Sequence, residues 1–183
     1  MTTTVEAVGQ SSLTPEQQSR DGIRRIALGL GDWRVSNDPD EDLVCLGLGS
    51  CVALCVYDPV AKVAGMAHMV LPDSTAARPG SSGTKFVDVA VPTVMEQVTR
   101  LGGIGGRLRV SLVGGASILA GAAFSGLPQI GARNVEAAVA VLGARHLKPD
   151  ATETGGTSGR TVRLSVRTGE LRVETAGRSA RAA

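Results

Sequence analysis

Two apolar runs joined by a short turn constrain the fold of this chain more than any other feature. Residues 52–57 form an apolar run of the buried-strand type, and Asp58-Pro59 closes it with a turn signal. Residues 63–71 then return as a second apolar run. The pattern predicts a β-hairpin with Cys51 near its open end and His68 on the facing strand.

The rest of the chain mixes strand and helix patterns. Further strands are expected at residues 25–30, 43–48, 108–113, 161–166 and 171–174, with the last two forming a hairpin. One helix is expected at residues 88–101, and a second with Asn134 as its N-cap and Gly143 at its end. Hydrophobic residues make up 43% of the sequence, aromatic residues only 2%, and there are 24 glycines. A core of small branched side chains with many turns favours α/β or α+β over a helix bundle.

The length of 183 residues suits a single domain with a sizeable core. We expect a flexible N-terminal extension at residues 1–20, a folded domain at 21–175 and a flexible C-terminal tail at 176–183. Residues 73–85 are rich in Ser, Gly, Pro and Ala and predict a long loop. A loop of this length next to a candidate site is often functional.

Charge and composition argue against several classes of function. The net charge is +2, no dense run of Lys and Arg occurs, and the scarcity of aromatic residues removes a stacking platform for nucleic acid. No apolar segment approaches the roughly 20 residues of a membrane span, and the N-terminus lacks the pattern of a secretory signal. Three cysteines, an odd number, indicate a reducing cytoplasm.

Cys51 and His68 are the two side chains that a Cys–His nucleophilic site requires. A free thiol has a pKa of about 8.5, and a neighbouring imidazole can take its proton to form the nucleophilic thiolate. Gly49 and Ser50 precede the thiol in a small turn, where backbone N–H groups can approach a developing oxyanion. On the bare residues two other interpretations stay open: Cys51 as a small buried hydrophobe, and His68 as a core histidine.

Neither a metal site nor a disulfide is expected. Cys51 and Cys55 share a strand face, but four strand residues span about 13 Å, whereas a disulfide needs Cα atoms within about 7 Å. Together with Cys45, these residues match no common zinc spacing. No glycine pattern completes a dinucleotide fingerprint, and no cofactor is expected.

Six short segments between residues 25 and 175 stand in a specific order. They are Gly47-Leu48-Gly49-Ser50-Cys51-Val52-Ala53, Asp58-Pro59, Gly65-Met66-Ala67-His68-Met69-Val70-Leu71-Pro72, Gly114-Gly115-Ala116, Ile130-Gly131-Ala132-Arg133-Asn134-Val135-Glu136 and Gly155-Gly156. In this order they resemble the CheD family of chemoreceptor glutamine deamidases. The Gly-Ser-Cys turn, the Met-Ala-His segment and the Gly-Ala-Arg-Asn segment together make the resemblance specific.

The resemblance implies a fold and an activity. The implied fold is α+β, a single-domain layered α/β/β sandwich with the Cys–His site at the end of a β-hairpin. The implied protein is a cytoplasmic chemotaxis enzyme that converts glutamine side chains of methyl-accepting chemoreceptors to glutamate and can also hydrolyse receptor methyl esters. The family's nucleophile matches Cys51 and its base matches His68. A CheC-type phosphatase is an implied partner.

Cys45 departs from the family pattern. The resemblance places a threonine of the catalytic triad at this position, six residues before the nucleophile. A thiol is a weaker hydrogen-bond partner than a hydroxyl, so either Cys45 suffices, or another group orients His68, or turnover is slow. If His68 needs an oxygen partner there, Cys45→Thr is expected to raise turnover. The departure also keeps open a second function, that of an adaptor that binds receptors or a CheC-type phosphatase without turnover.

Overall fold

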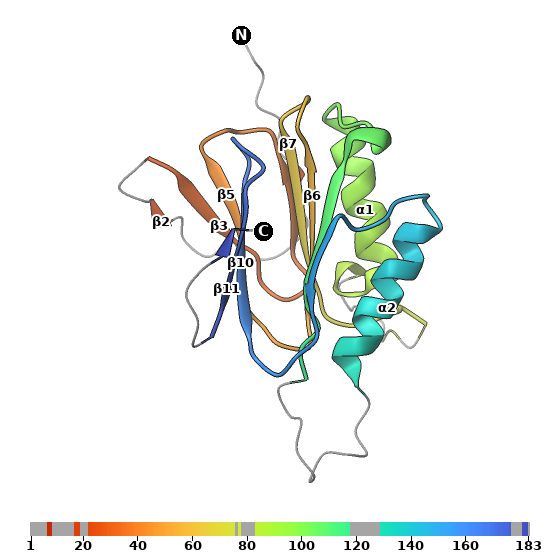
Figure 1. Cartoon of the computed structure of the whole chain (residues 1–183). Helices are drawn as coiled ribbons and strands as arrows, with labels where there is room; N and C mark the ends of the chain where they lie inside the picture. Colours follow the sequence, from red (N-terminus) through yellow and green to blue (C-terminus); the bar gives the residue numbers. More distant parts are fainter. Residues whose placement is uncertain are drawn as a thin grey trace.

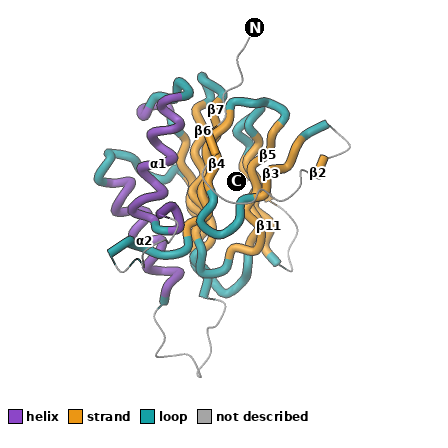
Figure 2. Tube along the Cα trace, turned by 180° about the vertical axis from the view of Figure 1, so that it is seen from behind, coloured by secondary structure: helices purple, strands orange, loops and turns teal. Residues whose placement is uncertain are grey.

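A computed structural model describes residues 7–8, 17–18, 22–75, 77, 83–117, 129–176 and 181–182. Within these ranges the chain forms two six-stranded β-sheets and two α-helices, an α+β fold. The three layers lie in the order helices, sheet A and sheet B, as the resemblance implied (Figure 1). Seen from behind, both helices remain on one side of the strands (Figure 2).

Sheet A lies in the middle layer. Its strand order is β1(Ala7–Val8), β4(Trp33–Ser36), β7(Val63–Met69), β6(Val52–Asp58), β8(Arg109–Gly114) and β9(Ala151–Thr154). Sheet B has the order β12(Arg181–Ala182), β11(Leu171–Thr175), β10(Arg160–Ser165), β5(Glu41–Leu48), β3(Arg24–Ala27) and β2(Gln17–Gln18). Helices α1(Val87–Arg100) and α2(Ile130–Gly143) cover sheet A, and the short 3-10 helices η1(Gly83–Lys85) and η2(Gly105–Arg107) lie in the connections. In these ranges no helix is long and apolar enough to cross a membrane.

The predicted central hairpin is confirmed as β6 and β7, paired from Val52↔Met69 to Asp58↔Val63. Every residue of both strands is buried, because sheet A is covered on both faces. Asp58 fixes the turn, since its carboxylate accepts hydrogen bonds from the N–H groups of Val60 and Ala61 at 2.8 and 2.9 Å. The same carboxylate pairs with Arg107 at 2.8 Å and thereby joins the hairpin to η2.

Alternation along β6 divides the apolar residues between two cores. Val52, Leu54 and Val56 pack toward the helices, whereas Ala53 and Cys55 pack toward sheet B. Helix α1 lies very close to β7. A Cβ on Gly65 would come within 2.8 Å of Val94 and 2.9 Å of Val98, so only glycine allows this approach.

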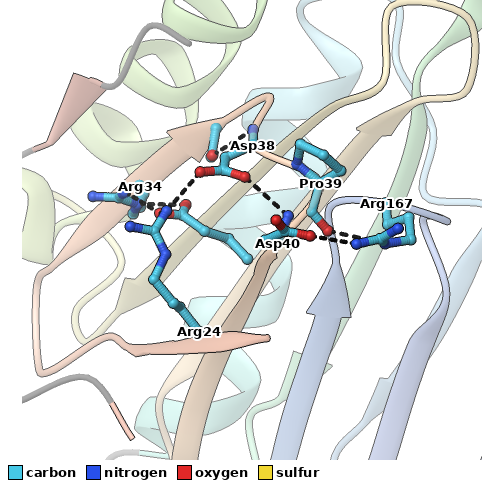
Figure 3. Close-up of polar contacts among 8 residues, drawn as sticks. Arg24, Arg34, Asp38, Pro39, Asp40 and Arg167 are labelled. Carbon is cyan, nitrogen blue, oxygen red and sulfur yellow. Dashed lines mark hydrogen bonds and ion pairs between the residues drawn. The ribbon is translucent and has the colours of Figure 1, made fainter. Parts of the chain in front are cut away.

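A buried ion pair joins the two sheets at the end where β5 begins. Arg34 of β4 in sheet A donates to Glu41 of β5 in sheet B, with a nitrogen–oxygen distance of 2.6 Å. Arg24 of β3 also pairs with Glu41 at 2.8 Å and with Asp38 at 2.6 Å. Figure 3 shows this cluster beside the exposed pair of Arg167 and Asp40. Glu41, which we call the polar junction, thus links strands β3, β4 and β5 through its ion pairs.

Some boundaries differ from the sequence-based expectation. Asn134 was expected to cap the second helix, but α2 begins four residues earlier, at Ile130, and the Asn134 side chain is fully buried. Strands β4 and β9 were missed. The expected extensions at residues 1–20 and 176–183 lie mostly outside the described residues; the described parts include the strands β1, β2 and β12. Part of the loop at residues 73–85 also lies outside them.

Candidate active site

The turn that carries Cys51 crosses from sheet B to sheet A, between the end of β5 and the start of β6. Its backbone is held by the segment after β8, because the N–H of Gly115 donates to the carbonyl of Cys51 and the N–H of Ala116 to that of Gly49, both at 2.7 Å. A Cβ on Gly114 would lie 2.2 Å from the Cys51 carbonyl oxygen. This contact requires glycine, which also accepts the φ of 113° at residue 114.

His68 lies on β7, directly opposite Ala53 of β6. Residues directly opposite each other in an antiparallel pair point to the same face, and so do residues two apart on one strand. His68 therefore faces the layer between the sheets, as Ala53 does, and Cys51, in the turn before β6, packs against the same layer. The thiol is half-buried and packs against the inter-sheet core, and the imidazole is 4% exposed.

The orientation of the His68 ring is set by a backbone carbonyl. Nδ1 of His68 lies 3.1 Å from the carbonyl oxygen of Leu28. A carbonyl can only accept a hydrogen bond, so Nδ1 carries the proton and Nε2 of the neutral ring keeps its lone pair. Among the described residues, the buried Nε2 has no hydrogen-bond partner. The free nitrogen is therefore the one that can act as a base.

The main chain of His68 is also fixed from the β3–β4 connection. The N–H of His68 donates to the carbonyl of Asp32, and the N–H of Gly31 donates to the carbonyl of His68, both at 2.9 Å. These contacts place the Leu28–Asp32 segment along β7 and explain why a carbonyl from that segment reaches the ring. The signal in the sequence was weak, because Gly29 and Gly31 indicate a turn but not its contact with β7.

Burial determines the protonation of the pair. It raises the pKa of the Cys51 thiol and lowers the pKa of His68. The Leu28 hydrogen bond and the charge of Asp32 act in the opposite direction on the pKa of His68, but more weakly. Both shifts favour an uncharged thiol and a neutral imidazole.

Cys45 lies on β5, fully buried in the core between the sheets. Its Sγ is 3.5 Å from the sulfur of Met66, and burial raises the pKa of the Cys45 thiol well above its usual range. Cys55 is buried as well, with a pKa of about 12. Of the three thiols, only Cys51 is partly exposed, and Cys45 and Cys55 are buried.

Asn134 connects the two halves of the candidate site, a role that the sequence pattern did not indicate. Its Nδ2 donates to the carbonyls of Ser50 and Val70, each at 2.9 Å. Ser50 precedes the thiol and Val70 follows His68 by two positions. Among the described residues no cluster of three or more His, Cys, Asp or Glu side chains could hold a metal ion.

A cavity of about 210 Å³ lies elsewhere, on the outer face of sheet B. Arg25, Asp42, Arg163 and Arg172 are among the residues that line it, and Cys51 and His68 are not. The concave surface and the candidate thiol site are therefore separate features.

Comparison with known proteins identifies the family. A family model described as CheD chemotactic sensory transduction matches residues 69–175. A probable chemoreceptor glutamine deamidase CheD from Symbiobacterium thermophilum is 42% identical over 161 residues, which cover 85% of this chain and 95% of that protein. The chemoreceptor glutamine deamidase CheD of Thermotoga maritima is 41% identical over 152 residues, covering 82% of this chain and 91% of that protein.

A solved structure is a more distant match. The hypothetical protein YfiH from Bacillus licheniformis aligns with a TM-score of 0.42 and 16% identity over 67% of this chain and 50% of that chain, a similarity too low to bear on fold or function. The family model and the two relatives agree, and they cover most of this sequence. The chain belongs to the CheD family.

Proposed function

We infer that this chain is a chemoreceptor glutamine deamidase, an amide hydrolase of bacterial chemotaxis with Cys51 as nucleophile and His68 as general base. The proposal is supported by a half-buried thiol in the turn before β6 and by an imidazole on β7 whose Nε2 has no hydrogen-bond partner among the described residues. The substrate class comes from the relatives, which are named as chemoreceptor glutamine deamidases.

In the proposed reaction, Nε2 of His68 takes the thiol proton while Sγ of Cys51 attacks the side-chain carboxamide carbon of a receptor glutamine. The backbone N–H groups of Ser50 and Cys51 are the proposed donors to the oxyanion of the tetrahedral intermediate. His68 returns the proton to the nitrogen, the C–N bond breaks and ammonia leaves, with a thioester remaining on Cys51. Water, deprotonated by neutral His68, then attacks the thioester to give glutamate and the free thiol.

The Leu28 carbonyl fills the orienting role in this proposal. It holds Nδ1–H in the same way that a carboxylate or hydroxyl does in other triads, and so fixes the ring with Nε2 available. Cys45 is placed against Met66 instead, which supports a packing role for that thiol. Gly49 and Ser50 serve the site through the backbone of the nucleophile turn. None of these steps uses a metal or an organic cofactor.

The proposed partners are the cytoplasmic helices of methyl-accepting chemoreceptors, which sets the protein in the cytoplasm; three free cysteines are in keeping with that compartment. Receptor methyl esters are the proposed second substrate, because attack by the same thiol releases methanol and gives the same thioester. A CheC-type phosphatase is the proposed protein partner.

A receptor adaptor without turnover is the second candidate. Burial favours the uncharged form of both Cys51 and His68, which favours slow chemistry in the free protein. Mixing the protein with peptides from receptor cytoplasmic helices distinguishes the deamidase from the adaptor. A deamidase releases ammonia and converts specific glutamines to glutamate by mass spectrometry, whereas an adaptor binds the peptides and leaves both signals at the level of a protein-free control.

A further inference from the structure

Asn134 is buried at a point where it contacts the backbone on either side of the candidate dyad. It lies on the second turn of α2 with no exposed surface. Both of its amide protons are used: one goes to the carbonyl of Ser50 and the other to the carbonyl of Val70, at 2.9 Å each. Ser50 is bonded directly to the nucleophile residue, and Val70 extends the strand that carries His68.

The direction of the Asn134 amide is unambiguous. Both partners are carbonyl oxygens and can only accept, so the amide nitrogen must face them and the amide oxygen must point away. Among the described residues, that buried oxygen has no hydrogen-bond partner. A buried acceptor without a donor lowers the stability of the fold, so an apolar side chain would fill this core position at a lower cost in free energy. The rule that buried polar atoms are hydrogen-bonded is most often broken at functional sites.

Helix α2 is pressed against the same turn by close backbone packing. A Cβ on Gly131 would lie 2.5 Å from the carbonyl oxygen of Gly115, and a Cβ on Gly115 would lie 2.5 Å from Val135. The N–H of Gly115 in turn holds the Cys51 carbonyl at 2.7 Å. The start of α2 therefore contacts the nucleophile turn through the Asn134 amide and through residue 115.

We propose that Asn134 is a positioning residue, which fixes the separation of Cys51 and His68 by joining the carbonyls of Ser50 and Val70. The inference rests on the proposed Cys–His chemistry and adds a residue that touches neither substrate nor reacting atoms. In the native structure the carbonyls of residues 49, 50 and 51 are all bonded, to Ala116, Asn134 and Gly115. Loss of the middle bond frees the peptide next to the thiol, and a misplacement of about 1 Å can cost about 10²-fold in rate.

The test compares Asn134→Ala with Leu142→Ala, a buried position two turns further along α2 in the helix–sheet core. The first measurement is the rate of iodoacetamide alkylation of Cys51 against pH, read by peptide mass spectrometry. It needs no receptor substrate. The second is kcat and KM for glutamine conversion in a receptor peptide, at a temperature where all variants are folded.

We expect Asn134→Ala to shift the alkylation profile toward that of His68→Ala, and to lower kcat at least about tenfold with little change in KM. Leu142→Ala is expected to lower Tm and keep the wild-type profile. The proposal is overturned if folded Asn134→Ala keeps the wild-type profile and kcat, or if Leu142→Ala alters both as much. Should Asn134→Ala fail to fold, Asn134→Ser carries the test with the same two outcomes. Absence of glutamine conversion by the wild type counts against the proposed function alone, because the alkylation result still decides the role of Asn134.

Discussion

The carbonyl oxygen of Leu28 lies 3.1 Å from Nδ1 of His68 and holds the ring with Nε2 unbonded among the described residues. This contact assigns the tautomer without any titratable third group. It also brings the connection between β3 and β4 into the candidate site. The base of the proposed reaction thus depends on the path of the main chain at residue 28 rather than on the side chain there.

Replacement of His68 tests the base. We expect His68→Ala to lose at least about 10²-fold in kcat, the usual contribution of a general base. Alkylation of Cys51 near neutral pH is also expected to slow, because no imidazole remains to accept the thiol proton. The two rates are measured on receptor peptide and with iodoacetamide. Identical alkylation kinetics of His68→Ala and wild type across the neutral range would show that the two side chains do not interact.

The pH dependence of kcat/KM follows from the direction of the His68 shift. Burial lowers the pKa of His68, so the imidazole stays neutral and basic to a pH below its ordinary value of about 6.5. The acid limb of the profile is therefore expected below about pH 6.5. Asp32→Asn is the matched variant: the Asp32 charge raises the pKa of His68, so its removal is expected to move the limb to still lower pH. A limb centred above about pH 6.5 would contradict this assignment.

The same shift predicts how stability changes with pH. The unfolded chain protonates His68 more readily than the folded protein, so the stability that neutral His68 contributes is present above about pH 6.5 and is lost as the pH falls. Thermal melts of the wild type and His68→Gln are the measurement. We expect the wild type to lose more Tm than His68→Gln on acidification, and equal losses would count against the shift.

The contacts of Cys45 bear on the expected effect of Cys45→Thr. If His68 needs an oxygen partner at this position, the sequence predicts a gain in turnover from a hydroxyl there. Because Leu28 already engages Nδ1 and Cys45 packs on Met66 in a closed core, we now expect no gain and a loss of about 1–3 kcal/mol from a buried hydroxyl without a partner. Cys45→Val, an apolar control of similar size, is expected to keep both turnover and stability. A faster Cys45→Thr enzyme of unchanged Tm would restore the triad interpretation.

How far the sequence predicts this fold depends on what each residue does locally. The β6–β7 hairpin follows from its apolar runs, and so does the place of His68 on its second strand. Strand β4 was missed because buried Arg34 and Ser36 interrupt the apolar pattern. The Leu28 contact could not be predicted, because every residue offers the same carbonyl and only the tertiary path selects one. Asn134 was misassigned because asparagine is a common N-cap, and only the buried contacts reveal its other use.

The junction of the two sheets offers a test of stability that is independent of catalysis. Glu41→Ala leaves Arg34 in a buried site without its carboxylate, and we expect a loss of about 3–5 kcal/mol in the free energy of unfolding. Asp40→Ala breaks the neighbouring pair with Arg167, in which both side chains are more than half exposed, and is expected to cost under about 1 kcal/mol. Urea unfolding measures both. Equal losses would contradict the assignment of Glu41 as the polar junction.

The most direct test of the account is the capture of the thioester on Cys51. A receptor peptide that contains a substrate glutamine is mixed with excess protein, quenched in acid, and the protein is digested for mass spectrometry. We predict an acyl adduct on Cys51 in the wild type, conversion of glutamine to glutamate, and unchanged activity in Cys55→Ala, whose buried thiol has a pKa of about 12. We predict neither adduct nor glutamate in folded Cys51→Ala. Glutamate formation by folded Cys51→Ala at the wild-type rate would contradict the central claim that Cys51 is the nucleophile.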